Sequence, residues 1–537
     1  MTDPARQSDA IVVGSGPSGA VVANELAHAG IGVTVFEQGD WIPAEAFDGA
    51  RPQWELTQLR QWHPNPNIRD RREDYPIDVT HSDINPLMFA GVGGAALIYG
   101  AHWMRFMPSD FRVRTLDGVA DDWPLTYADL APFYAYVEEA MGVSGEDGNP
   151  AYPDGAPTPL PALPIGKVGR KAALGMNRLG WHWWPGSNAI PSRPWRRLQP
   201  CVLRGTCGTG CSDDAKATPD RTHWPDAIAA GARMIAGARV AEVTVNRWNR
   251  ATGVVWIDRN GLRHRHDADI VILCANGVGT PRILQMSRDG AGIANRSGLV
   301  GRRLMMHPYA GVMGTFDADL ESWVGPAGQI LTSVEFYETD ESRGFLRGAK
   351  WNCMPAGGPQ SFRAGYGDGP LTGAWGETLH RRVKRKFGRS FEWGIVGEDL
   401  PDPDNRVGLS DTLTDSDGLP APEIHYAVSD NTRKLLDFHI ARATEALEAA
   451  DAIETQVTPL IRDCGWHLMG TAVMGDAPDR SVVNDRGRSH DIANLYVMDA
   501  STFPTSSGMN PTATIMAVAA RAVLDLIENR RDVERAA

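Results

Sequence analysis

The sequence contains no run of about 18 apolar residues, the length that a membrane-spanning helix needs. Its first residues lack the basic and then apolar layout of a secretory signal. Lysine and arginine number 53 against 66 aspartate and glutamate residues, which gives a formal net charge of −13. Nucleic-acid binding needs a basic surplus on at least one face. We therefore expect no membrane or nucleic-acid partner, and a cytoplasmic location.

Cysteine is scarce, with six residues among 537. Such a low content excludes a disulfide framework and favours a reducing compartment. Cys201, Cys207 and Cys211 stand close together, but their spacing is not Cys-x-x-Cys, and no fourth cysteine or histidine stands at zinc spacing. We expect a packed or paired structural role for them and no bound metal. The Cys-x-x-Cys-His motif is also missing, so any haem would be on another subunit.

The chain is too long for one ordinary hydrophobic core, because single cores stop growing at roughly 250–300 residues. Hydrophobic residues make up 42% of the sequence and charged residues 22%, the balance of a globular enzyme. We therefore expect two domains that share an interface.

Three consecutive segments near the N-terminus have the pattern of a βαβ unit. Residues 10–14 form a short apolar run, typical of a buried parallel strand. Residues 20–30 carry apolar positions at helical spacing and end in glycine, and residues 32–37 are again strand-like. The segment predicts a strand, a helix and a second parallel strand.

The turn between this strand and helix carries Gly14, Gly16 and Gly19. Only a backbone without Cβ allows the tight turn and lets a pyrophosphate approach the helix N-terminus, whose free N–H groups favour anions. Glu37 ends the second strand, where its carboxylate can accept hydrogen bonds from ribose hydroxyls. The residues predict a bound dinucleotide and leave FAD and NAD open, although residues 15–20 resemble the flavoprotein variant of the motif.

Two further buried strands are expected far along the chain, at residues 269–275 and 495–499. Residues 511–526 have apolar positions at helical period, so this helix should pack back onto the first domain. Strands from both chain ends would then share one sheet. The predicted fold class is α/β, with a Rossmann-type domain.

The C-terminal region closely resembles the glucose–methanol–choline (GMC) oxidoreductases. The resemblance rests on residues 464–475, which contain His467, on residues 496–501 and on residues 508–512. Further matching stretches are residues 91–94, 276–284 and 400–407, so the resemblance covers essentially the whole chain.

The resemblance implies the GMC fold, FAD as cofactor and the side chains that hold it. In that family the matching histidine and asparagine, here His467 and Asn510, face the reactive edge of the flavin. The matching Asp-Ala and Asn-Pro-Thr segments hold the isoalloxazine and ribityl groups. The predicted cofactor-binding residues are Gly14, Ser15, Gly16, Ser18, Gly19, Glu37, Gly93, Gly94, Val240, Asp499, Ala500, Asn510, Pro511 and Thr512.

Composition along the chain predicts how the two domains are divided. Residues 150–200 are rich in proline and tryptophan, and residues 311–454 carry glycine-rich loops, which is typical of a less regular, inserted α+β domain. We assign residues 1–155, 201–310 and 455–537 to the FAD-binding domain and residues 156–200 and 311–454 to the substrate-binding domain.

One position departs from the family pattern. Relatives often carry a histidine four residues after the Gly-Gly pair, and in fungal pyranose oxidases this histidine bonds covalently to FAD. Ile98 occupies that position here, and isoleucine cannot form the bond. His102 comes four residues too late, so we expect it to line the flavin pocket. The prediction is noncovalent FAD.

The chemistry expected at the site is alcohol oxidation with hydride transfer to flavin N5. His467 is the predicted base for the hydroxyl proton, since neutral histidine has a pKa near the working pH. Asn510 is predicted to hold the substrate oxygen through its amide NH₂.

Residues 103–111 and 122–130 resemble the gluconate dehydrogenase and pyranose oxidase branch, which includes bacterial glycoside 3-oxidases. We expect oxidation of a secondary ring hydroxyl of a sugar or glycoside to a keto sugar, with oxygen favoured as acceptor. The alternatives are a dehydrogenase for an aminoglycoside, polyol or sugar acid that uses a quinone or cytochrome, and, more remotely, a flavin-containing lyase. The exact substrate, the oxidised carbon, the acceptor and the oligomeric state stay open.

Several side chains are candidates for substrate contacts without a spacing that selects them. The tryptophans either stack on a sugar ring or pack in the core. The polar candidates are Glu335, Glu392, His223 and His307, and the tryptophan candidates are Trp181, Trp183, Trp184 and Trp195.

Overall fold

The computed structural model describes residues 8–69, 71–326, 328–359 and 375–535. Its first sheet has seven strands in the order β7-β2-β1-β10-β9-β8, and β18 pairs with β10. The pairs β7-β2, β2-β1, β1-β10 and β10-β18 are parallel, whereas β9 runs antiparallel to β10 and β8. The strands are β1 (Ser8–Val13), β2 (Val33–Glu37), β7 (Arg233–Ala236), β8 (Arg239–Val245), β9 (Ala251–Ile257), β10 (Arg263–Leu273) and β18 (Leu495–Val497).

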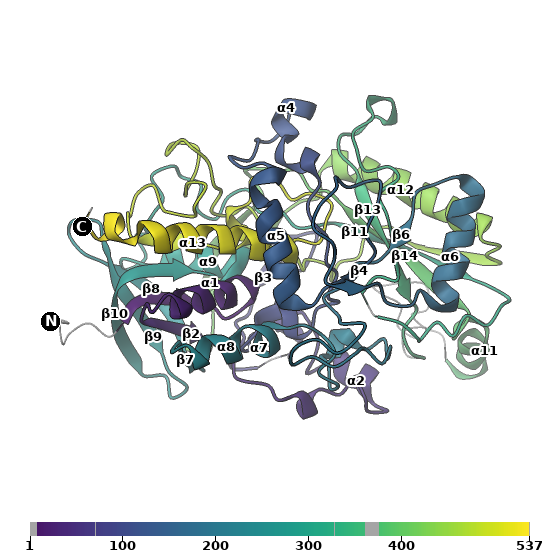
Figure 1. Ribbon diagram of the computed structural model, residues 1–537, viewed down its shortest axis with the longest axis horizontal. Coiled ribbons are helices and arrows are strands. Elements are labelled where there is room, and N and C mark those ends of the chain that lie inside the picture. Colours follow the sequence, from purple (N-terminus) through teal and green to yellow (C-terminus); the bar gives the residue numbers. More distant parts are fainter. Residues whose placement is uncertain (1–7, 70, 327, 360–374, 536–537) are drawn as a thin grey trace.

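Both faces of the parallel part of this sheet are buried. Ala10 and Val12 of β1 pack in one apolar cluster with residues of α1 (Pro17–His28) and α13 (Thr512–Arg535), and Ile11 and Val13 pack in another. The first and last long helices lie side by side (Figure 1). The predicted βαβ unit and the predicted pairing of strands from both chain ends are confirmed.

The extent of β10 differs from the prediction. The strand begins at Arg263 and not at residue 269, because residues 263–267 leave the parallel sheet and pair with β9. The side chains of this first half are largely exposed, so it lacks the continuous apolar run that marked the buried half.

The second sheet has six antiparallel strands in the order β17-β11-β14-β13-β12-β6. One face is covered by α6 (Gly166–Leu179) and α12 (Asp430–Ala449), as Figure 1 shows on the side away from the chain ends. The strands are β6 (Trp184–Pro185), β11 (Tyr309–Thr315), β12 (Leu331–Ser333), β13 (Ala349–Pro355), β14 (Ser390–Gly397) and β17 (Glu454–Thr458).

Side chains alternate between the two faces of this sheet. Trp351 of β13 and Trp393 of β14 belong to the apolar cluster under the helices. Lys350, Met354 and Glu392 have the opposite parity and therefore lie on the other face. That face turns toward the first sheet and forms one wall of the cavity described below.

A three-stranded sheet, β15-β16-β3, joins segments that the sequence assigns to different domains. The domain boundaries given above therefore remain a proposal. The strands are β3 (Asp78–Ser82), β15 (Arg406–Thr414) and β16 (Pro420–Tyr426), and β4 (Ser144–Gly145) pairs with β5 (Leu160–Pro161).

The other helices are α2 (Trp54–Gln58), α3 (Pro66–Arg69), α4 (Val113–Asp117), α5 (Tyr127–Met141), α7 (Pro219–Thr222), α8 (Trp224–Ala229), α9 (Asn276–Met286) and α11 (Gly376–Lys386).

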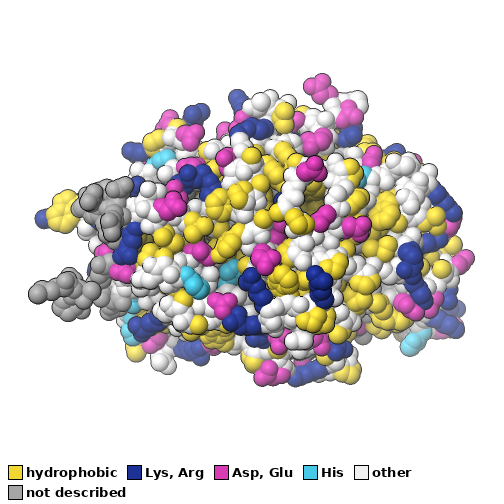
Figure 2. All heavy atoms as spheres, viewed as in Figure 1, with side chains coloured by type: hydrophobic (Ala, Val, Ile, Leu, Met, Phe, Trp, Pro, Cys, Tyr) yellow, Lys and Arg dark blue, Asp and Glu magenta, His cyan; other side chains and the backbone are white. Residues whose placement is uncertain are grey.

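The surface carries charges of both signs. Basic and acidic side chains are interspersed over the face drawn in Figure 2. Within the described ranges, no helix is both long enough and apolar enough to span a bilayer.

Candidate functional site

A cavity of about 440 Å³ lies between the glycine loop of the first sheet and the open face of the second. It is lined by the carboxyl ends of β1 and β2, by the segment before α13 and by side chains of β11 and β14. Among the predicted cofactor residues, every one except Gly19 and Gly93 contributes to its lining. The predicted pair His467 and Asn510 also lines it.

Glycine is needed at the three positions of the loop for different physical reasons. A Cβ on Gly14 would lie 2.3 Å from the Cys274 carbonyl oxygen, and one on Gly19 would lie 2.0 Å from the Gly14 oxygen. A Cβ on Gly16 would meet nothing nearer than 3.9 Å. Packing thus requires glycine at positions 14 and 19, and Gly16 leaves open room in front of α1. This space fits a pyrophosphate at the helix N-terminus.

Glu37 is held at the cavity wall by the same loop. Its carboxylate accepts hydrogen bonds from Ser15 N at 3.1 Å, Ser15 Oγ at 2.7 Å and Gly39 N at 2.9 Å. Burial raises the pKa of Glu37, and these hydrogen bonds partly offset that rise. The Ser15 side chain therefore orients the carboxylate that is expected to bind ribose.

A second glycine loop crosses the first at close range. Gly93 and Gly94 both have positive φ, at 116° and 62°, and a Cβ on Gly94 would lie 2.9 Å from the Gly16 Cα. Gly93 N donates to Ser15 Oγ at 3.3 Å. The Gly-Gly pair therefore lets two loops meet beside the predicted pyrophosphate position. Ile98, four residues further on, is fully buried and lines the cavity.

His467 faces His307 because of local strand pairing. Met305 and Met469 form an isolated antiparallel bridge, and in that register residues 307 and 467 lie opposite each other. The Nδ1 atoms of the two imidazoles are 2.7 Å apart. Sequence reasoning named His307 only as one of several polar residues, since the bridge joins segments about 160 residues apart.

The partners of His307 settle which nitrogen of His467 carries the proton. His307 Nε2 lies 2.7 Å from the Ser507 carbonyl oxygen and 3.2 Å from that of Ser506, and carbonyls only accept. His307 Nε2 must therefore be the N–H. Burial lowers the pKa of His307 to about 4, so its Nδ1 is a free acceptor at neutral pH. His467 Nδ1 then donates to it, and His467 Nε2 keeps its lone pair.

Asn510 is oriented by a buried lysine that the sequence did not reveal. Lys350 Nζ donates to Asn510 Oδ1 and, at 3.1 Å, to Gln329 Oε1. The Gln329 amide is itself fixed, because its Nε2 donates to the Ser187 carbonyl. With its oxygen on Lys350, Asn510 turns its NH₂ group toward His467.

The two predicted site residues meet at the cavity. Asn510 Nδ2 lies 3.4 Å from His467 Nε2 and 3.4 Å from the Tyr309 hydroxyl. The pKa of His467 is lowered well below its usual value, foremost by burial and further by His307, Lys350 and His102. The arrangement therefore presents a neutral imidazole nitrogen and an amide donor side by side, within reach of one common oxygen atom.

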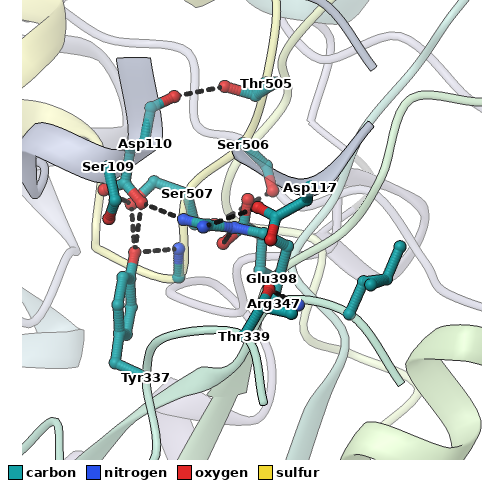
Figure 3. Close-up of polar contacts among 12 residues, drawn as sticks. Ser109, Asp110, Asp117, Tyr337, Thr339, Arg347, Glu398, Thr505, Ser506 and Ser507 are labelled. Carbon is teal, nitrogen blue, oxygen red and sulfur yellow. Dashed lines mark hydrogen bonds and ion pairs between the residues drawn. The ribbon is translucent and has the colours of Figure 1, made fainter. Parts of the chain in front are cut away.

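A buried polar cluster fixes the loop that carries Asn510 (Figure 3). Ser507 has a positive φ of 58°, and its Oγ donates to Asp110 Oδ2 at 2.7 Å. The Tyr337 hydroxyl lies 2.8 Å from Ser507 Oγ and donates to Asp110 Oδ1 at 2.9 Å. Gly508 N donates to the same hydroxyl at 2.9 Å. These contacts hold an uncommon backbone conformation three residues before Asn510.

One arginine holds this cluster together. Arg347 is 1% exposed and contacts Asp110 at 2.7 Å, Glu398 at 3.0 Å and Asp117 at 3.1 Å. Three carboxyl groups thus lie within 3.1 Å of one guanidinium. Burial raises the pKa of Glu398, and the ion pair with Arg347 partly offsets that rise. No motif around Arg347 signals this role in the sequence.

Several predicted substrate contacts are not brought to the cavity. Trp181 packs against Phe336 and Trp351, as the packing alternative expects. Neither it nor Trp183, Trp184 or Trp195 lines the cavity. Glu335 and His223 also lie elsewhere, whereas Glu392 lines the cavity wall.

The remaining candidate features are the cysteines and metal sites. No disulfide joins the six cysteines, all of which lie in described segments. The described residues contain no group of three or more His, Cys, Asp or Glu side chains arranged to hold a metal ion.

The sequence matches the description GMC oxidoreductase over residues 189–309 and 401–519, and the description NAD(P)-binding Rossmann-like domain over residues 12–71. It is 39% identical to 2-methyl-1,2-propanediol dehydrogenase of Mycolicibacterium austroafricanum, over 97% of this chain and 95% of that relative. It is 28% identical to the fructose dehydrogenase large subunit of Gluconobacter japonicus, over 97% and 98%. Among solved structures, pyridoxine 4-oxidase from Mesorbium loti superposes with a TM-score of 0.64 at 17% identity, covering 97% of this chain and 99% of that one.

Proposed function

Since this chain belongs to the GMC oxidoreductase family of FAD-dependent alcohol oxidoreductases, we propose that it oxidises a hydroxyl group of a sugar or glycoside, with His467 as the base. The product would be a keto sugar formed at a secondary ring hydroxyl. The observation that carries the proposal is the 3.4 Å separation of His467 Nε2 and Asn510 Nδ2 at the cavity. A hydroxyl oxygen placed between them donates its proton to the first and accepts a hydrogen bond from the second.

The chain's own residues supply positioning and proton handling. Asn510 holds the substrate oxygen, which orients the reacting carbon. His467 Nε2 takes the hydroxyl proton, while His307 keeps the other nitrogen of that ring protonated and fixes the ring plane. When bound, FAD supplies the hydride acceptor at its N5 atom.

The cavity contains the groups that binding of FAD needs. Open space at Gly16 and the α1 N-terminus suit the pyrophosphate, and Glu37 suits the ribose. Asp499, Ala500, Pro511 and Thr512 line the stretch that leads to His467, where we place the flavin end. The other proposed contacts are Ser18, Gly94 and Val240.

A second candidate is a dehydrogenase for another alcohol class, such as a small polyol. The 39% identity to 2-methyl-1,2-propanediol dehydrogenase favours it. We propose oxygen as electron acceptor for the first candidate and a quinone or cytochrome for the second. Oxygen uptake measured against dye reduction separates the two.

Anaerobic flavin reduction tests the proposed function. Purified holoenzyme is mixed under nitrogen with monosaccharides, O- and C-glycosides, aminoglycosides and small diols. Bleaching of the flavin absorbance by a sugar or glycoside is the expected result. Bleaching by small diols alone would favour the second candidate, and no bleaching by any alcohol would favour the lyase alternative.

The cofactor is expected to be noncovalent because Ile98 occupies the position at which relatives often carry a histidine, the residue that bonds to FAD in fungal pyranose oxidases. His102 lines the cavity but is displaced by four residues. Acid precipitation should therefore release all of the yellow colour into the supernatant. A fluorescent flavin band that stays with the polypeptide in a denaturing gel would contradict the prediction.

A further inference from the structure

Glu392 has a buried carboxyl group that no described residue neutralises. Its side chain is 7% exposed and lines the cavity. No hydrogen-bond donor or cation among the described residues contacts it, and burial alone raises its pKa to about 7. An unpaired buried carboxyl group is costly, so its presence at a ligand cavity calls for a partner that arrives from outside.

Other buried carboxyl groups of the protein are paired. Asp499 accepts hydrogen bonds from Thr280 and Ser501, and Asp399 accepts them from Tyr426 and Met306 N. Glu398 contacts Arg347. The partners of these carboxyl groups are other residues of the protein, whereas Glu392 has no such partner among the described residues.

The sheet face beside Glu392 is hollowed by two glycines. Gly311 of β11 and Gly394 of β14 lie opposite each other in the antiparallel register. A Cβ on Gly311 would lie 2.9 Å from the Glu392 carboxyl carbon, and one on Gly394 would lie 2.5 Å from the methyl group of Met354. The carboxyl group therefore leans over Gly311, into space that any other residue there would fill.

The register places this carboxyl group one substrate length from the catalytic pair. Tyr309, which contacts Asn510, lies two residues before Gly311 on β11. Two residues of strand span about 7 Å. A six-membered ring with its substituents bridges such a separation, so one molecule can reach both His467 and Glu392.

We propose that Glu392 is a specificity-determining residue that binds a second hydrogen-bond donor of the substrate, a hydroxyl or an ammonium group, opposite the hydroxyl that reacts at His467. The proposal rests on the proposed function, because it names the substrate class that this site selects. Compounds with one hydroxyl and no second donor would leave the carboxyl group buried and unpaired. Polyols and amino alcohols satisfy it.

Three probes with the same ring isolate this contact: cyclohexanol, trans-cyclohexane-1,4-diol and trans-4-aminocyclohexanol. The second-order rate constant of anaerobic flavin reduction is measured for each probe with wild-type holoenzyme, Glu392→Gln and Glu392→Leu. Glu341→Gln, a change at an exposed glutamate outside the cavity, serves as the control. Flavin content and thermal midpoint are recorded for every variant.

The wild type should prefer the diol to cyclohexanol by about 3–10-fold, and the amino alcohol by about 10–100-fold if the donor is an ammonium group. Glutamine keeps an acceptor but no charge, so E392Q should keep the preference for the diol and lose that for the amine. E392L should lose both, and E341Q should lose neither. Preferences that survive in E392L would overturn the proposal.

A binding measurement separates this proposal from the proposed function. Cyclohexylammonium has no hydroxyl to oxidise, and its binding is followed by the perturbation of the flavin absorbance. Weaker binding to E392L than to wild type supports the contact even if no alcohol bleaches the flavin, an outcome that would reject only the proposed oxidation. Equal binding of this ion and of the diol by both proteins would reject the role of Glu392.

Discussion

Replacement of His467 by alanine is expected to slow flavin reduction by an alcohol about 10²–10⁴-fold, the usual contribution of a positioned general base. The reason is that Nε2 is the nitrogen of this ring that keeps a lone pair, since Nδ1 donates to His307. The reductive half-reaction is measured by anaerobic stopped-flow absorbance at saturating substrate. Wild-type turnover in an H467A variant that retains bound FAD would exclude this residue as the base.

Two variants of His307 test how the base is held. Asparagine offers an acceptor for the His467 Nδ1–H and a donor for the Ser507 carbonyl, whereas leucine offers neither. We expect His307→Asn to retain more activity than His307→Leu.

The acid limb of the pH–rate profile should also differ between the two His307 variants. The lowered pKa keeps His467 neutral well below pH 6.5 in the wild type, and activity is lost only as the pH falls through that lowered value. Equal rates and equal profiles in both variants would argue against this role for His307.

Replacement of Arg347 by methionine is expected to lower the free energy of unfolding by about 3–5 kcal/mol, because it leaves buried carboxyl groups without their counter-charge. Asp110, Asp117 and Glu398 all lose their contact with the guanidinium. Activity should fall as well, since Asp110 holds the loop that carries Asn510. Urea unfolding followed by tryptophan fluorescence measures the change, because Trp103, Trp123, Trp224, Trp351 and Trp393 are fully buried.

Arg381→Met is the matched control, because this arginine lies on the exposed face of α11 and forms an exposed ion pair with Glu377. Exposed ion pairs contribute about 0–1 kcal/mol. Glu398→Gln is expected to cost less than R347M, since the guanidinium keeps its contacts with Asp110 and Asp117. If R347M were no less stable than R381M, the buried cluster would contribute nothing to the fold.

The parts of the fold that sequence reasoning predicted are those set by local pattern. The βαβ unit follows from one apolar run, one glycine loop and one helical repeat, all within 40 residues. The second sheet was expected only as a less regular domain, because its strands β6 and β17 are about 270 residues apart. Pairing over such separations depends on tertiary packing that periodicity does not record.

The site divides in the same way. His467 and Asn510 stand in recognisable motifs, and the structure places them 3.4 Å apart. Lys350 and Arg347 stand in no motif, because each acts through contacts with residues distant in the chain. The four tryptophans illustrate the opposite case, in which a sequence feature points to residues that do not line the site. Their abundance raised the possibility of sugar stacking, but composition does not say which face of a sheet or helix a side chain occupies.

The order in which the ribosome makes this chain gives β18 a further significance. The strand pairs with β10, yet about 480 residues separate it from the end of β1. At roughly 5–20 residues per second, synthesis takes about 25–100 s to reach it after the glycine loop has emerged. Asp499, Asn510 and α13 follow β18, so the cofactor cavity closes only after these residues have been made. Throughout that interval the nascent first domain exposes the apolar surface that β18 and α13 later cover, and FAD can complete its contacts only at the end.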